Sequence, residues 1–246
     1  MENRTSDLQA APVDTTSTTI TIKGILSLLL QNVDENDGRR LISLGMGDPT
    51  AFSCFHTTHV SQEAVVDALQ SDKFNGYAPT VGLPQTRRLQ ACTASKHRAY
   101  SLEGVIERIK KYFDILGGPA TFIQAAVPRI LQQTEEAFFK KTLYLLKQSS
   151  DICCDRINEI PCLTCPSKPE GSMAVMVKLD LSLLEDINDD IEFCFKLVKE
   201  ENVIFLPGTA VGLTSWIRVT FAADPSSIEE ALRRTKSFYQ RHARKL

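Results

Sequence analysis

Apolar residues recur at helical spacing along most of this 246-residue chain, and the spacing changes to short runs or to alternation in only a few places. The last helical stretch is typical, because Ile228, Leu232, Phe238 and Tyr239 form its apolar stripe. Pro128 falls inside another helical pattern and is a candidate kink. The pattern predicts seven helices, at about residues 22–30, 61–70, 101–116, 120–133, 135–158, 189–200 and 226–244.

Four segments show strand patterns instead, at residues 41–44, 173–179, 203–206 and 216–221. The second and the fourth are expected to pair as one sheet. Alternation along the fourth segment places Arg218 on the face opposite to Ile217 and Val219. Helices separate and follow the last three strands, so the C-terminal half predicts a compact α+β unit with helices covering a small sheet.

Glycine and proline mark the predicted loops. Gly45 and Gly47 follow the first strand, where two glycines let the backbone turn sharply and come close to another group. Residues 74–84 and 161–169 are predicted as loops without regular structure. Residues 1–19 are polar, rich in threonine and serine, and are expected to be disordered.

Charge and hydropathy exclude two classes of partner. The net charge of −2 gives no basic excess for nucleic acid, and no apolar run approaches the roughly 20 residues needed to cross a membrane. The first 19 residues lack the apolar segment of a secretion signal, so a cytoplasmic location is the default expectation.

The chain has seven cysteines, an odd number that favours reduced thiols over a disulfide framework. Cys153 and Cys154, together with Cys162 and Cys165, could be read as a zinc site. Adjacent residues on a helix point apart, however, so most of these cysteines are interpreted as core residues and no metal site is expected.

Arg218 is the residue with the clearest chemical meaning, because a guanidinium inside an alternating strand needs an anionic partner. Its planar fork can hold a carboxylate through two parallel hydrogen bonds. The alternative is an arginine on the solvent face of an edge strand. The residues alone favour that alternative, since arginine is mostly an exposed residue.

Several blocks of sequence resemble one known family. They are residues 42–50, 75–87, 151–155, 168–173, 206–209 and 216–222, within a similarity that extends from about residue 109 to the C-terminus. The chain resembles the fold-type I, pyridoxal-phosphate-dependent aminotransferases, and most closely the plant tyrosine aminotransferase-like group. The resemblance implies a truncated form of the α/β family fold, with an amino-terminal arm and an α+β small domain.

The resemblance also assigns roles to three positions. Arg218 matches the arginine that holds the substrate α-carboxylate, and Gly47 matches the glycine whose backbone lies against the substrate. Tyr77 matches the tyrosine that reaches the phosphate of pyridoxal phosphate across a dimer interface. Without the family, Gly47 and Tyr77 would be interpreted as a turn glycine and a packing aromatic.

Between Arg87 and about Ser101 the sequence departs from the family pattern. Relatives carry a long central block there, which forms most of the large-domain sheet and supplies the Schiff-base lysine. Lys96 is the one candidate for that lysine, but the residues after it do not match, and a linker lysine is the favoured interpretation. Transamination needs both the cofactor and its lysine, so this chain is expected to be inactive by itself.

The expected organisation follows from this departure. It comprises a disordered tail at 1–19, an amino-terminal arm at 20–88, an atypical junction at 89–104, remnant large-domain helices at 105–134 and a small domain at 135–246. Without the large-domain sheet, the helices at 101–133 should expose apolar surface. The expected partners are an amino acid or 2-oxo acid, a second copy of the chain, or a full-length relative. A carbon–sulfur lyase ancestry remains an alternative to a transaminase.

Overall fold

The computed structural model describes residues 21–34, 36–93 and 103–245. The predicted disordered tail and Lys96 lie outside these ranges. The chain divides into two compact units, one formed by residues 1–49 and 146–246 and the other by residues 50–145. Within the described ranges, no helix has the length and apolar character needed to cross a membrane.

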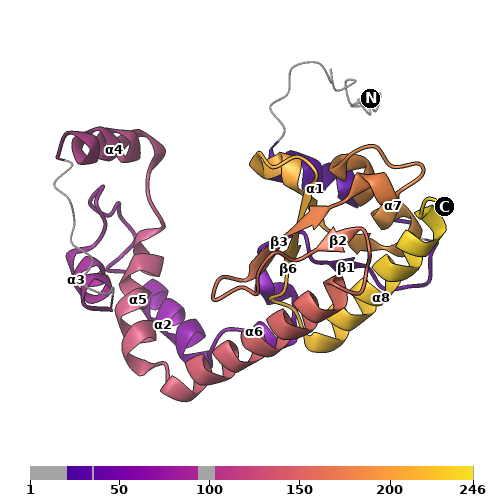
Figure 1. Ribbon diagram of the computed structural model, residues 1–246. Helices are drawn as coiled ribbons and strands as arrows, with labels where there is room; N and C mark the ends of the chain where they lie inside the picture. Colours follow the sequence, from indigo (N-terminus) through magenta and orange to yellow (C-terminus); the bar gives the residue numbers. More distant parts are fainter. Residues whose placement is uncertain (1–20, 35, 94–102, 246) are drawn as a thin grey trace, which may run out of the picture. The chain divides into compact units, whose positions relative to one another are not determined.

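The first unit is built on a four-stranded antiparallel sheet (Figure 1). Its strand order is β2 (Leu163–Thr164), β3 (Ala174–Leu179), β6 (Trp216–Thr220) and β5 (Leu206–Pro207). The predicted pairing of the second and fourth strand segments is confirmed, with Val175 opposite Val219. A separate parallel pair joins β1 (Ile42–Ser43) to β4 (Val203–Ile204). The unit therefore has the expected α+β character with a mostly antiparallel sheet.

Two details of the sheet differ from the prediction. The strand predicted at 203–206 is split, because β4 pairs with β1 while β5 pairs with β6. The loop predicted at 161–169 contains β2, whose Leu163 is buried and pairs with Leu179. β2 has only two residues, too few for an alternating pattern, so the sequence did not reveal it.

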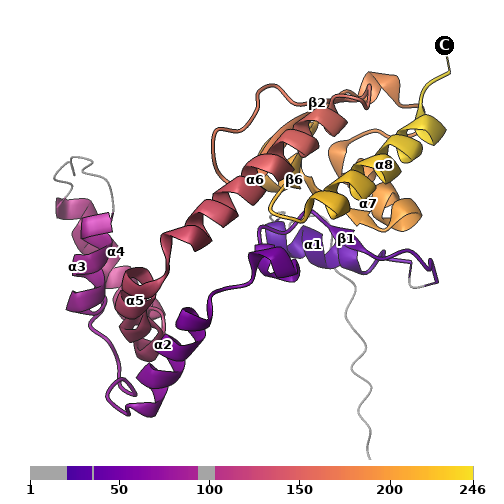
Figure 2. The same cartoon turned by 90° about the horizontal axis from the view of Figure 1, so that it is seen from below.

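Helices α1 (Ile22–Leu30), α7 (Asp190–Glu201) and α8 (Pro225–His242) belong to this unit, with the C-terminal half of α6 (Glu136–Ile157) beside α8 (Figure 2). The core between helices and sheet includes Ile217 and Phe238, both fully buried. Helix α8 begins one residue earlier than predicted. Its N-cap is Asp224, whose carboxylate accepts the backbone N–H of Ser227 at 2.9 Å.

The amino-terminal segment is part of this core. The backbone N–H of Leu44 donates to the carbonyl of Ile204 at 2.8 Å, and the carbonyl of Leu44 accepts the N–H of Thr220 at 2.7 Å. Leu44 itself is fully buried. Residues far apart in the sequence thus complete one hydrogen-bonded layer, which fixes the backbone beside Gly45.

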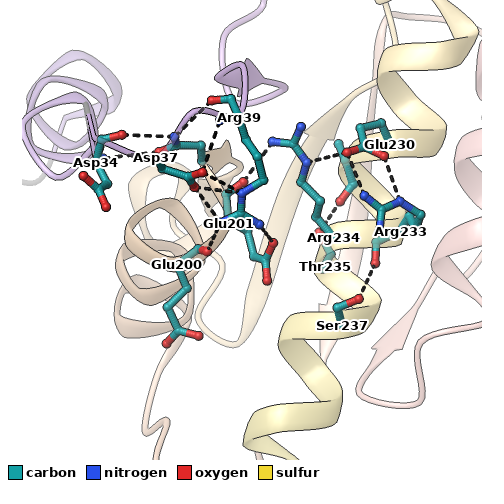
Figure 3. Close-up of polar contacts among 12 residues, drawn as sticks. Asp34, Asp37, Arg39, Glu200, Glu201, Glu230, Arg233, Arg234, Thr235 and Ser237 are labelled. Carbon is teal, nitrogen blue, oxygen red and sulfur yellow. Dashed lines mark hydrogen bonds and ion pairs between the residues drawn. The ribbon is translucent and has the colours of Figure 1, made fainter.

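A network of charged residues connects the amino-terminal segment to α7 and α8 (Figure 3). Arg234 of α8 is almost fully buried, and its Nη1 donates to the carbonyls of Arg40 at 2.9 Å and Glu201 at 3.1 Å. Its Nε donates to the carboxylate of Glu230 at 2.7 Å. The carboxylate of Glu201 accepts a hydrogen bond from Arg39. Three segments of the chain therefore meet at one set of buried charges.

The second unit is helical, with α2 (His59–Gln70), α3 (Pro84–Thr93), α4 (Glu103–Leu116), α5 (Thr121–Gln133) and the start of α6. Helices α2 and α5 lie side by side around a small cluster of Ala64, Ala68 and Ala126 (Figure 1). The sequence did not predict α3, because this polar segment carries no apolar stripe.

Pro128 lies inside α5, as expected from the sequence. Proline has no N–H, so the carbonyl of Gln124, four residues earlier, lacks its helical donor. The hydroxyl of Thr86 in α3 donates to that carbonyl at 2.6 Å. Both residues are buried, which makes this bond a link between α3 and α5.

Helix α4 exposes the apolar surface that the sequence predicts for this region. Its Tyr112, Ile115 and Leu116 are 70, 84 and 72% exposed. Large apolar groups this far in solvent on one helix are unusual for a monomeric protein.

Candidate functional site

Arg218 lies on a central strand of the four-stranded sheet. Its strand, β6, has β3 on one side and β5 on the other, with Met176 and Leu206 as the cross-strand neighbours of Arg218. The alternative of a solvent-facing arginine on an edge strand is therefore wrong. The side chain is partly buried, on the face opposite to the fully buried Ile217 and Val219.

The guanidinium of Arg218 lacks a counter-charge. Its Nη2 donates to the carbonyl of Gly45 at 2.9 Å, while its Nε is buried without a hydrogen-bond partner. No carboxylate in the described ranges forms an ion pair with it. Burial lowers the pKa of Arg218 below its ordinary value, because the charged form loses hydration. A buried donor of this kind is costly unless an acceptor pairs with it.

Two buried hydroxyls on neighbouring segments of the first unit are also unpaired. The buried Oγ of Ser43 on β1 and Oγ1 of Thr220 on β6 have no hydrogen-bond partner. With Arg218 Nε they make up the buried side-chain atoms without partners in the described part of the chain. These segments are neighbours, because Thr220 donates its N–H to Leu44. Unpaired polar groups are therefore concentrated where β6 meets the amino-terminal segment.

Gly45 is the glycine with a steric requirement at this site. A Cβ atom there would lie 3.0 Å from the Ile204 side chain and 3.1 Å from the Phe205 backbone. Gly47 is exposed, and a Cβ there would meet nothing within 4 Å. The carbonyl of Gly45 binds Arg218, and the role of Gly47 beside a substrate stays a prediction. The signal was present in the pair of glycines directly after a buried strand.

Tyr77 is the third residue to which the family resemblance assigns a role. It belongs to the second unit, whereas Arg218, Gly45 and Gly47 belong to the first. Its side chain is fully exposed. Its role toward a cofactor phosphate stays a prediction.

Comparisons with known proteins identify a family whose match includes Arg218. The family described as "Aminotransferase class I and II" matches residues 101–234, just over half of the chain. The chain is 39% identical to "Probable aminotransferase TAT2" of Arabidopsis thaliana, in an alignment that covers 94% of this chain and 97% of that protein. The chain belongs to the class I and II aminotransferase family.

Other relatives of this aminotransferase-family chain match shorter stretches. "S-alkyl-thiohydroximate lyase SUR1" of Arabidopsis thaliana is 48% identical over 141 residues, which is 57% of this chain and 30% of that protein. Several other curated plant relatives are also matched over only 25 to 33% of their length. The solved structure of tyrosine aminotransferase from Leishmania infantum has a TM-score of 0.69 at 17% identity, covering 93% of this chain and 99% of that one. At that identity the likeness supports the fold alone.

The alignment with the Arabidopsis aminotransferase TAT2 also contains a large internal difference. It is 403 positions long, 157 more than the 246 residues of this chain. At least 157 aligned positions of that relative therefore have no counterpart here.

Members of this family normally use pyridoxal phosphate, which is held by a lysine through a Schiff base. A Schiff base needs a lysine whose amine loses its proton readily, as it does in an apolar pocket. No lysine in the described ranges is buried. The pKa of Lys168 is raised, not lowered, because it pairs with Asp151. The part of the chain that the structure describes therefore does not fit covalent attachment of this cofactor.

Proposed function

We propose that this chain binds a small carboxylic acid, such as an amino acid or a 2-oxo acid, at Arg218 and does not carry out transamination by itself. The observation that carries the proposal is the partly buried guanidinium with an unpaired Nε and no counter-charge. A carboxylate is the anion whose planar shape matches two donors of one guanidinium. This assignment agrees with the role that the family resemblance gives to Arg218.

The expected affinity is modest. A hydrogen bond to a charged group contributes about 1.5 to 3 kcal/mol, so two of them give a dissociation constant of about 1 mM. The carbonyl of Gly45 keeps the guanidinium in place through Nη2, and the other donors of the guanidinium are proposed to hold the ligand carboxylate. Gly47, three residues after the buried Leu44, is proposed to line the open side of this site.

The proposed lack of transamination follows from the lysines of the chain. Transamination requires the cofactor as an electron sink and a lysine to hold it and move the α-proton. The described lysines do not fit, and Lys96 lacks the surrounding family motif. Contacts with the substrate carboxylate alone cannot lower the barrier of the chemical step.

Ligand binding can be followed by NMR through Trp216, the single tryptophan, which lies two residues from Arg218 on the same strand. Titration with phenylpyruvate should shift the indole N–H signal with millimolar affinity, whereas phenylacetone, which lacks the carboxylate, should not. Arg218→Gln should weaken binding at least tenfold. The control is Arg40→Gln, which changes an exposed arginine of the same unit. Equal affinity in the two variants would contradict the assignment.

The catalytic half is tested separately. The chain is incubated with pyridoxal phosphate, reduced with borohydride and mapped by mass spectrometry for a pyridoxyl-lysine. We expect no stoichiometric adduct and no transamination with tyrosine and 2-oxoglutarate. A stoichiometric adduct on Lys96 with turnover would refute the inactive assignment while leaving carboxylate binding at Arg218 intact.

A second candidate function is association with another protein through helix α4, which is supported by its exposed Tyr112, Ile115 and Leu116. The proposed partners are a second copy of the chain or a full-length relative. Light scattering should show a dimer that Ile115→Glu converts to a monomer, while Lys111→Glu, an exposed change on the same helix, leaves it intact. Monomeric wild-type chain would exclude self-association.

Two finer points stay proposals. The matched segments are shared between aminotransferases and the lyase relative, so a carbon–sulfur lyase ancestry is kept as the alternative to a tyrosine aminotransferase-like one. A cytoplasmic location is likewise retained, and fluorescence microscopy of a tagged chain tests it.

A further inference from the structure

Two cysteines of the first unit face each other although they come from different elements. Cys154 lies near the end of α6, and Cys165 lies in the loop directly after β2. Their Sγ atoms are 3.4 Å apart. A disulfide needs a separation of about 2.05 Å, so the two sulfur atoms would have to approach by about 1.4 Å.

The loop that carries Cys165 is held against α6 at several points. The backbone N–H of Cys165 donates to Oδ1 of Asn158 at 3.1 Å. Three residues later, Lys168 forms ion pairs with Asp151 at 3.2 Å and Asp155 at 3.4 Å, both on α6. These contacts keep the two thiols opposite one another without a covalent bond.

The two thiols differ in access to solvent. Cys165 is partly exposed, whereas Cys154 is 1% exposed. Burial and the neighbouring Cys165 thiol raise the pKa of Cys154 to about 12, so it is a neutral thiol at rest. Cys153, the next residue along the helix, is completely buried. An oxidant from solvent would therefore meet Cys165 first.

We propose that Cys154 and Cys165 form a reversible disulfide when the chain meets a peroxide, which makes them a thiol switch. The pair is an oxidation site and not part of a metal site, because no group of three candidate metal ligands occurs in the described ranges. The link would join the end of α6 to the loop that leads into β3, on the same side of the unit as the Lys168 ion pairs.

The chemistry balances with hydrogen peroxide as the oxidant. The sulfur of Cys165 attacks one peroxide oxygen, the O–O bond breaks, and Cys165 becomes a sulfenic acid while one water leaves. The sulfur of Cys154 then attacks the Cys165 sulfur, the S–S bond forms and the S–O bond breaks. The departing hydroxide takes the proton of Cys154 and leaves as a second water. Two thiols are thus oxidised and one peroxide is reduced, and a dithiol reverses the bond by exchange.

Peptide mapping tests the proposal on the whole chain. The chain is treated with hydrogen peroxide, free thiols are blocked with iodoacetamide, and the unfolded product is digested with trypsin. We expect the peptide 148–156 joined to the peptide 157–178, two hydrogen atoms lighter than their sum and separated by dithiothreitol. Fragmentation of the joined peptides must place the link at Cys154 and Cys165, since each peptide contains a second cysteine, Cys153 or Cys162.

Variants and thermal unfolding give independent readouts. Cys165→Ser should abolish the joined peptide, and the matched control Cys162→Ser should keep it. The ring closed by the disulfide contains 12 residues, so oxidation should raise the melting temperature of wild type by about 5 °C, and that of Cys165→Ser not at all. The proposal is refuted if wild-type Cys165 is oxidised to sulfinic acid while Cys154 remains alkylated by iodoacetamide, or if the link joins Cys153 or Cys162.

Discussion

Replacement of Arg234 by methionine gives the sharpest test of how the first unit is held together. Methionine keeps much of the buried aliphatic stem of arginine but removes the guanidinium. The change deletes the donors to the carbonyls of Arg40 and Glu201 and the hydrogen bond to Glu230 (Figure 3). Arg234 is 5% exposed, so water cannot replace these donors without rearrangement of the unit.

The expected loss of stability follows from the partners left behind. A buried carbonyl without a donor, such as that of Glu201, costs about 1 to 3 kcal/mol, and the partly buried carbonyl of Arg40 costs less. Glu230 still has Arg233 as a partner. The two carbonyls together therefore give a loss of about 2 to 4 kcal/mol in the free energy of unfolding. For a unit of this size that corresponds to a fall in melting temperature of roughly 10 °C.

Arg233 provides a matched control because it binds the same carboxylate. Its Nε and Nη2 each lie 2.8 Å from Glu230, but its side chain is 65% exposed. Exposed ion pairs contribute about 0 to 1 kcal/mol, so Arg233→Met should be nearly neutral. Arg234→Lys should fall between the two, since an ammonium keeps the charge but cannot span all three acceptors.

Urea unfolding followed by fluorescence of Trp216 measures the stability of the first unit, since Trp216 is the single tryptophan and lies in that unit. Stability is compared through the midpoint and the slope, and a constant slope shows that the variants differ in stability alone. If Arg233→Met and Arg234→Met destabilise equally, or if Arg234→Met costs less than about 1 kcal/mol, burial does not explain the role of Arg234.

Three further predictions follow from single residues. Arg233 and Arg234 lower the pKa of Glu230 from 4.5 to about 2, so the contribution of Glu230 to stability is complete above pH 4.5 and is lost as the pH falls toward 2. Glu230→Gln should therefore flatten the acid side of the stability curve measured by Trp216 fluorescence. Gly208→Ala should leave little folded chain by circular dichroism, because its Cβ would lie 2.3 Å from the carbonyl oxygen of Leu213. Thr86→Val should lower the free energy of unfolding of the second unit by about 1 to 3 kcal/mol in urea titrations followed by circular dichroism, since the buried Gln124 carbonyl loses its donor, whereas Thr86→Ser should be milder.

The spacing of apolar residues was sufficient to predict the longer elements. Helix α7 and strand β3 occur within one residue of their predicted bounds, because each buries one face against a common core. The polar helix α3 was missed, since its stability comes from tertiary contacts such as the Thr86 bond and not from an apolar stripe. The two-residue strand β2 was missed, and β5 was not distinguished from β4, because these divisions arise from pairing and not from a pattern in the sequence.

The candidate site was predictable only in part, for a similar reason. Alternation along β6 was enough to place Arg218 on the face opposite to Ile217. Whether that strand lies at an edge or in the centre depends on which strands pair with it, and pairing is a property of the whole sheet. The Gly45–Arg218 hydrogen bond and the Cys154–Cys165 contact were not predictable either, because each joins residues from different elements of the fold.

The hydrogen bonds around Leu44 explain how the proposed carboxylate site at Arg218 is held in place within the first unit. Leu44 bridges β4 and β6, and the next residue, Gly45, accepts the hydrogen bond from Arg218. Every contact that positions the guanidinium therefore comes from residues 1–49 and 146–246, which form one compact unit. If Arg218 binds a carboxylate as proposed, the contacts that orient its guanidinium lie within the first unit.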